Sequence, residues 1–141
     1  MKNFFLFLLP LLFVSSCSPI NVSKSESHNM ISSNIKKCCE WNETLNQEEN
    51  EYYAYIYSET CGFCRKAETY IEKLNEEFLV YYVLFSESIP IKSERENLQG
   101  VDDINSLFIL GTPTLFKIVH KKVEKCYVGL NEIQDHVKEV V

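Results

Sequence analysis

Residues 55–66, "YIYSETCGFCRK", join an apolar run to two cysteines separated by two residues, and the architecture can be worked out from them. The run reaches back to Glu51, and "EYYAYIYS" (51–58) is almost entirely apolar and aromatic. Such a run is typical of a central strand buried on both faces. From Cys61 onward, apolar residues recur at spacings of three and four: Cys64, Ala67, Ile71, Leu74 and Phe78. That period predicts an amphipathic helix with one face on a core.

A second apolar run, "LVYYVLF" at 79–85, follows the predicted helix and indicates another strand. A strand, a helix and a strand at this spacing form a βαβ unit, in which the two strands are parallel. The first half of the domain therefore predicts the α/β class.

The second half predicts a connecting helix around 101–108, a strand at 113–119 and its hairpin partner at 123–129. Asn131 is expected to cap a last helix, with Gln134 as its capping-box partner. The predicted buried face of that helix consists of Ile133, Val137 and Val140. The expected order is β-α-β, then a helix, then β-β-α, around a central mixed sheet.

Cys61 falls where the predicted strand has ended and the helix begins. Unpaired N–H groups and the positive end of the helix dipole therefore point at its sulfur, which favours a negative charge by ~0.3–1 kcal/mol, up to ~2 when partly buried. Because one pKa unit is ~1.4 kcal/mol, the helix end can lower a thiol pKa from ~8.5 towards ~7. Gly62 leaves Cys61 open, whereas Cys64 is sheltered on the apolar face. Disulfide exchange needs an exposed attacking thiol with a buried resolving thiol.

A CxxC pair also occurs in zinc sites and in structural disulfides, so the pair alone does not decide its chemistry. A zinc site needs a second pair, and "KCCEW" (37–41) has the wrong spacing for one. The strand-to-helix junction and Gly62 between the cysteines favour a redox dithiol. We expect no metal and no cofactor.

The CxxC at 61–64 with Arg65 and Lys66 behind it, together with "GTPTLF" (111–116), resembles the thioredoxin superfamily over residues 40–141. The resemblance implies a thioredoxin-like fold and an exchange of disulfides with protein thiols. It makes Cys61 the nucleophile and Cys64 the resolving cysteine. Residues implied in substrate binding are Gly62, Phe63, Thr112, whose backbone would pair with the substrate peptide, and Pro113, a cis-proline.

Three positions depart from thioredoxin itself. Thr60 stands where thioredoxin has Trp, Tyr55 replaces its buried acid, and Phe63 replaces the Pro between its cysteines. The resemblance therefore supplies neither a proton-transfer acid nor a redox potential. The motifs are most similar to those of small extracytoplasmic thioredoxin-like proteins of Gram-positive-type bacteria, including bacteriocin-transport accessory proteins.

The chain begins with a leader, "MKNFFLFLLPLLFVSSCS", whose apolar run is shorter than the ~20 residues that span a bilayer. "VSSC" (14–17) resembles the lipobox of bacterial lipoproteins, which makes Cys17 the lipidated residue and 1–17 the signal peptide. An ordinary cleaved signal and a retained anchor are the alternatives. The Ser- and Asn-rich segment 18–37 is expected to be a flexible tether, and 38–141 the domain.

This leader predicts a location outside the cytoplasmic membrane, either tethered to the cell membrane by an N-terminal lipid or secreted. The formal charge is −6, and no basic cluster is present, so nucleic acid is not an expected partner. The expected partners are protein thiols and disulfides, with a membrane or extracytoplasmic redox partner.

Three further cysteines, Cys38, Cys39 and Cys126, have no role in the predicted dithiol. Adjacent cysteines rarely bridge each other because the geometry is strained. Either Cys38 or Cys39 bridges to Cys126 as a structural brace, or the vicinal pair relays electrons to the dithiol. The three histidines receive no role.

The predicted function is thus an extracytoplasmic thiol–disulfide oxidoreductase of the thioredoxin type. The alternative is a non-enzymatic thioredoxin-like accessory or metal-delivery protein for a secretion or assembly system. The direction of electron flow does not follow from the sequence.

Overall fold

The computed structural model describes residues 36–141, so the predictions for the leader, for Cys17 and for most of the tether lie outside the described residues. The described part contains two α-helices, two short 3-10 helices and five strands: β1 (Lys37–Cys38), β2 (Glu51–Tyr57), β3 (Val80–Leu84), β4 (Thr114–Val119) and β5 (Lys122–Val128). No helix in residues 36–141 is both long and apolar enough to cross a membrane.

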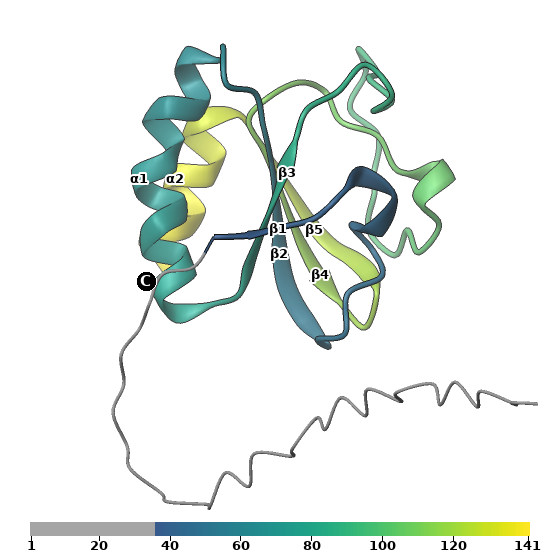
Figure 1. Ribbon diagram of the computed structural model, residues 1–141, viewed down its shortest axis with the longest axis horizontal. Helices are drawn as coiled ribbons and strands as arrows, with labels where there is room; N and C mark the ends of the chain where they lie inside the picture. Colours follow the sequence, from purple (N-terminus) through teal and green to yellow (C-terminus); the bar gives the residue numbers. More distant parts are fainter. Residues whose placement is uncertain (1–35) are drawn as a thin grey trace, which may run out of the picture. The chain divides into compact units, whose positions relative to one another are not determined.

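The strands form one sheet in the order β1-β3-β2-β4-β5 (Figure 1). β3 pairs in parallel with both β1 and β2, whereas β4 pairs antiparallel with both β2 and β5. The predicted mixed sheet is confirmed, and so are the four predicted strands. β1 is additional, and its first residue, Lys37, is the last residue of the predicted tether.

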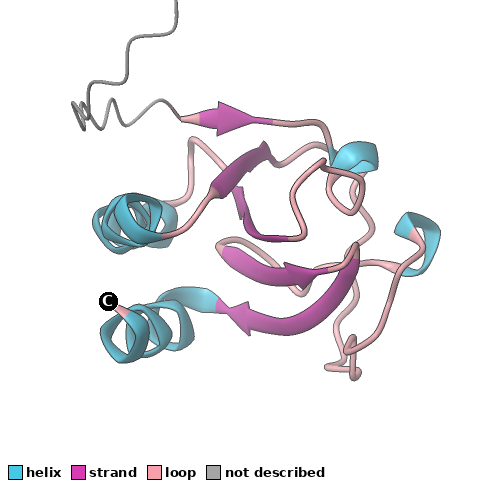
Figure 2. Cartoon of the chain, turned by 90° about the horizontal axis from the view of Figure 1, so that it is seen from below, coloured by secondary structure: helices cyan, strands magenta, loops and turns pink. Residues whose placement is uncertain are grey.

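Both α-helices, α1 (Gly62–Glu77) and α2 (Gly129–Val140), lie on the same face of the sheet (Figures 1 and 2). The helix predicted from Cys61 is confirmed as α1, and it buries the stripe Cys64, Ala67, Ile71 and Leu74. Phe78 is its C-cap residue, and the Phe78 N–H donates to the Leu74 carbonyl at 2.8 Å.

Loops cover the opposite face of the sheet (Figure 2). The loop residues buried there include Leu45, Ile89, Leu98, Leu107, Phe108 and Ile109. Tyr52, Ala54 and Ile56 of β2 pack against this set. Tyr53 and Tyr55, which alternate with them along the strand, pack under the helices instead. β2 is therefore buried on both faces, which explains its nearly unbroken apolar sequence.

The prediction of a helix around 101–108 is wrong, because only a single 3-10 turn, η2 (Ile104–Ser106), forms there. The Asp103 carboxylate accepts the Asn105 N–H at 3.0 Å, a local bond that competes with helix formation. Leu107, Phe108 and Ile109 are consecutive and all buried. An extended segment can bury successive side chains on its two sides, whereas one face of a helix cannot hold three in a row. The other 3-10 helix, η1 (Trp41–Glu43), precedes β2.

The predicted start of the last helix is also wrong. α2 begins at Gly129, with Val128 as its N-cap residue, and Asn131 is exposed. No N-cap side chain bonds to the helix; instead the Glu132 carboxylate accepts the Val128 N–H at 2.9 Å. Gly129 has φ +79°, a left-handed conformation that lets β5 turn directly into the helix.

The buried face of α2 differs from the expected one at two positions. Ile133 and Val137 are buried as expected, but Val140 is 37 % exposed. His136, which the sequence left without a role, is buried beside them.

Candidate active site

Cys61 is the N-cap residue of α1, and its sulfur accepts the Cys64 N–H at 3.1 Å. The backbone of Cys61 is extended, with φ −83° and ψ 115°, and its own N–H donates to the Ser58 carbonyl at 3.1 Å. A short turn after Tyr57 thus places a sulfur where sequence analysis expected it. A side chain that bonds to the first helical N–H groups relieves donors that would otherwise be unpaired.

The two cysteines differ in exposure. Cys64 is 3 % exposed and lies on the buried stripe of α1. Cys61 is half-buried, and Gly62 beside it is exposed, with open space where a side chain would project. Phe63 is 61 % exposed. A partner can therefore reach Cys61, whereas Cys64 is covered.

The Thr112–Pro113 segment borders Cys61. β4 runs antiparallel to β2, and the pairing of Ile56 with Thr114 brings the residues before β4 beside the start of α1. The Cys61 thiol donates to the Thr112 carbonyl at 3.5 Å. The Thr112–Pro113 peptide bond is cis, as the family resemblance implied.

The pKa values of the two thiols move in opposite directions. Burial raises the pKa of Cys61, but hydrogen bonds from the Cys64 thiol and from the N–H groups of Cys64 and Phe63 outweigh it, and the net pKa lies below the ordinary value. Burial, and then the bond to Cys61, raises the pKa of Cys64. Cys61 is therefore the more acidic thiol of the pair, and Cys64 is the thiol that holds its proton more tightly.

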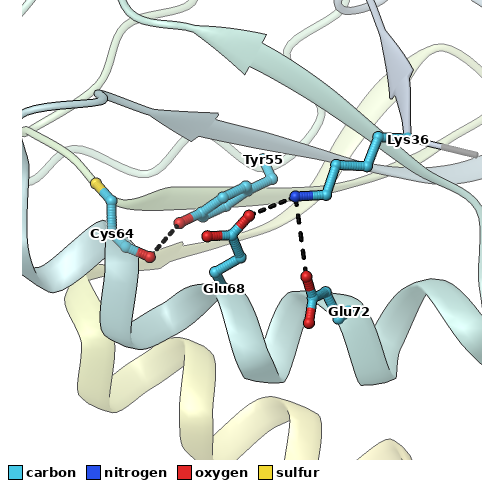
Figure 3. Close-up of polar contacts among 5 residues, drawn as sticks. All are labelled: Lys36, Tyr55, Cys64, Glu68 and Glu72. Atoms are coloured by element: carbon cyan, nitrogen blue, oxygen red, sulfur yellow. Dashed lines mark hydrogen bonds and ion pairs between the residues drawn. The ribbon is translucent and has the colours of Figure 1, made fainter. Parts of the chain in front are cut away.

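Tyr55, at the position where the family resemblance implied an acid, lies beside Cys64 (Figure 3). Its hydroxyl donates to the Cys64 carbonyl at 3.1 Å, and burial raises its pKa, so it stays neutral and positions the first turn of α1 (Figure 3). Lys36 forms ion pairs with Glu68 and, at 3.8 Å, with Glu72, on the far side of the Tyr55 ring (Figure 3). Sequence analysis missed this contact because it placed Lys36 in the tether.

The residues predicted to bind substrate share one surface. Phe63, Thr112 and Pro113 line a hollow of about 240 Å³ that is completed by the start of α2, including Leu130. Gly62 and Phe63 line a second hollow together with Arg65 and Lys66. The catalytic and binding roles of these residues stay predictions, but the fold brings all of them together around Cys61.

The expected bridge between Cys38 or Cys39 and Cys126 is wrong. β1 and β5 form opposite edges of the sheet, which puts their residues roughly 19 Å apart at the usual strand spacing. A disulfide needs Cα atoms within about 7 Å. All five described cysteines are free thiols. The electron relay remains a hypothesis; Cys38 and Cys64 line the same hollow of about 390 Å³, which also contains Tyr55 and Tyr82.

No group of three or more His, Cys, Asp or Glu side chains in residues 36–141 is arranged to hold a metal ion.

No family model and no curated protein matches the chain. Among solved structures, the chain is similar to thioredoxin f2 of Chlamydomonas reinhardtii, with a TM-score of 0.49 and 13 % identity over 74 % of this chain and 92 % of that one. The short form of thioredoxin f from spinach chloroplast has a TM-score of 0.48 and 19 % identity, and the match covers 78 % of this chain and 95 % of that one. Mitochondrial thioredoxin 3 from Saccharomyces cerevisiae has a TM-score of 0.48 and 12 % identity, and the match covers 74 % of this chain and 94 % of that one.

The topology of the described residues assigns the fold by itself. A parallel β2–α1–β3 unit is joined to an antiparallel β4–β5 hairpin and α2, the two helices share one face of the sheet, and a CxxC pair opens α1. The chain has the thioredoxin fold.

Proposed function

We propose that the protein is a thiol–disulfide oxidoreductase that exchanges disulfides with protein substrates through Cys61 and Cys64. The observation that carries this proposal is the Cys61 sulfur at the N-cap of α1, held by the Cys64 N–H at 3.1 Å. It combines a lowered pKa with an approachable sulfur, and the second thiol of the pair is buried within one helical turn.

The exchange follows from these positions. The Cys61 thiolate attacks one sulfur of a substrate disulfide; that S–S bond breaks, and the other substrate sulfur leaves as a thiolate with the bonding electron pair. The Cys64 thiol then gives its proton to solvent, from which the departed substrate thiolate can take one, and attacks the Cys61 sulfur. A Cys61–Cys64 disulfide forms, the second substrate sulfur is released, and the substrate has gained two electrons. An oxidising enzyme runs the same steps in reverse.

The substrate cysteine would reach Cys61 along the surface of Phe63, Thr112 and Pro113. The Thr112 carbonyl lies 3.5 Å from the Cys61 sulfur, so an extended peptide that pairs with the Thr112 backbone brings its own sulfur to the nucleophile. The open hollow that Phe63, Thr112 and Pro113 line supports protein disulfides as the substrate class.

Insulin reduction with dithiothreitol as the electron source tests the proposal. We expect the wild type to reduce insulin and Cys61→Ser to lose the activity completely. Cys64→Ser should trap a mixed disulfide between Cys61 and insulin that is visible on a non-reducing gel. Cys126→Ser, in β5 and outside the hollows that Phe63 lines, is the matched control and should stay active. Activity that survives in Cys61→Ser would contradict the proposal, and partner binding without any exchange would favour the accessory role.

We propose further that the domain works outside the cytoplasmic membrane, tethered through lipidated Cys17, with a redox partner in or beyond that membrane. The leader sequence and its "VSSC" motif support this location. Metabolic labelling with a radioactive fatty acid should mark the wild type, and Cys17→Ser should lose the label and leave the membrane fraction. Unchanged labelling of Cys17→Ser would exclude the lipid anchor.

A further inference from the structure

Two cations stand beside the dithiol without an acidic partner. Arg65 and Lys66 follow Cys64 directly and are both exposed. Within residues 36–141 neither forms an ion pair, although six other cations do: Lys36, Lys37, Lys92, Arg95, Lys117 and Lys122. The whole chain carries a formal charge of −6, so this positive spot contrasts with the rest of the protein.

The two cations lie beside the exposed residues that follow Cys61. Gly62, Phe63, Arg65 and Lys66 line a hollow of about 410 Å³ next to Cys61. The Lys66 ammonium lies 5.9 Å from the centre of the Phe63 ring. Both side chains therefore flank the exposed aromatic ring between the two cysteines.

The acidic residues of this region leave both cations unpaired. Lys36 pairs with Glu68 and Glu72, the acids nearest to them in sequence on α1 (Figure 3). Glu59 lines a neighbouring hollow together with Arg65 but forms no ion pair with it. The hydrogen-bond donors of Arg65 and Lys66 are thus available to an incoming group.

We propose that Arg65 and Lys66 select substrate peptides that carry acidic residues beside the disulfide-bonded cysteine. This proposal rests on the proposed exchange function and names its substrate class. An extended peptide advances about 3.3 Å per residue, so when its cysteine meets Cys61, its next two residues pass over the first turns of α1. A carboxylate at those positions can receive charge-assisted hydrogen bonds, which Arg can make in pairs.

Three matched peptides test this selectivity. Each has one cysteine bound in a mixed disulfide to thionitrobenzoate, and the two residues on either side of it are Asp, Asn or Lys. The Cys61 thiolate attacks the peptide sulfur, and thionitrobenzoate leaves as a coloured thiolate with the bonding electrons. Rates of colour release give the ratio between peptides, which cancels any effect of a variant on Cys61 itself.

We expect wild type to react about fivefold faster with the Asp peptide than with the Asn peptide, a size consistent with one or two exposed ion pairs, and slowest with the Lys peptide. The preference should vanish in 1 M salt, where the screening length falls to about 3 Å. Arg65→Glu and Lys66→Glu should each shrink or reverse it.

Lys73→Glu is the matched control, because the substitution changes the charge by the same amount. Lys73 is exposed on the same helix about two turns further on, and it forms no ion pair within residues 36–141. Equal rates for the three peptides, or an equal change in Lys73→Glu, would overturn acid selectivity while leaving the exchange function intact. No colour release from any peptide would overturn the exchange function itself.

Discussion

Two neighbouring tyrosines under α1 have hydroxyl groups in opposite situations. The rings of Tyr55 and Tyr82 pack edge to face, with their centres 5.8 Å apart. The Tyr55 hydroxyl donates to the Cys64 carbonyl, whereas the Tyr82 hydroxyl is buried and has no hydrogen-bond partner within residues 36–141. We predict that Tyr55→Phe lowers the free energy of unfolding by about 1 kcal/mol, because a hydrogen bond is lost. Tyr82→Phe should be neutral or stabilising, because it removes an unsatisfied polar group. Urea unfolding measures both, and equal losses would contradict the prediction.

We predict that His136 makes the stability of the domain depend on pH. It is buried, bonds to the Tyr53 hydroxyl at 2.9 Å and stacks on Tyr127. Its pKa is lowered by burial first and then by the positive charges of Lys125 and Lys117, which together outweigh the opposing charge of Glu139. The unfolded chain therefore binds a proton more readily than the folded one, and stability falls as pH drops below about 6.5.

The test compares urea unfolding at pH 7.5 and pH 5.5. We expect wild type to lose stability over this range and His136→Gln to lose less of it. His120 lies exposed in the β4–β5 turn, so His120→Gln should lose as much stability between pH 7.5 and pH 5.5 as the wild type does. If His136→Gln lost as much stability as the wild type over this pH range, other groups would cause the pH dependence.

At the scale of elements, the two helices begin on glycines with different requirements. Gly129 has φ +79°, and its N–H donates to the Pro113 carbonyl at 2.8 Å, so the start of α2 is fixed to the segment beside Cys61. Gly62 at the start of α1 has no positive φ and open space around it. We predict that Gly129→Ala costs about 1–2 kcal/mol of stability because of left-handed strain. Gly62→Ala should instead stabilise by about 0.4–1 kcal/mol, because it restricts the unfolded chain. Thermal unfolding measures both variants, and midpoint temperatures that shift in the same direction for both would refute this account.

At the scale of the whole molecule, burial separates the thiols into groups of different reactivity. Burial raises the pKa of Cys39 to about 11 and that of Cys126 to about 12. We predict that iodoacetamide at pH 8 labels Cys61 first and Cys39 and Cys126 last, as mass spectrometry of peptides would report. Mild oxidation should yield the Cys61–Cys64 disulfide within one chain, and a Cys39–Cys126 crosslink would contradict the described sheet.

The sequence was sufficient for the parts of the fold that local pattern determines. The β2 run, the helical period after Cys61 and the β3 run each depend on neighbours in the chain, and all three were predicted correctly. The position of Cys61 at a helix N-terminus followed from where one pattern ended and the next began.

The rest depends on contacts between distant residues. His136 could not be placed from sequence, since its partner Tyr53 is 83 positions away. The bridge from Cys38 or Cys39 to Cys126 was inferred without the strand order, which puts the two ends on opposite edges. The start of α2 was set by a backbone conformation at Gly129 and by the Glu132 carboxylate, which replace the capping side chain that the pattern suggested.

β1 contributes only two residues, yet it occupies the outer side of β3, where Cys39 extends the contact through its N–H to the Tyr82 carbonyl at 3.1 Å. Four of the five residues of β3 are buried, and a long apolar strand at an open edge recruits strands from other molecules. A chain shortened to begin at Glu40 should therefore fold but polymerise on concentration, which light scattering would detect. The short strand at the end of the predicted tether would then protect the domain against aggregation.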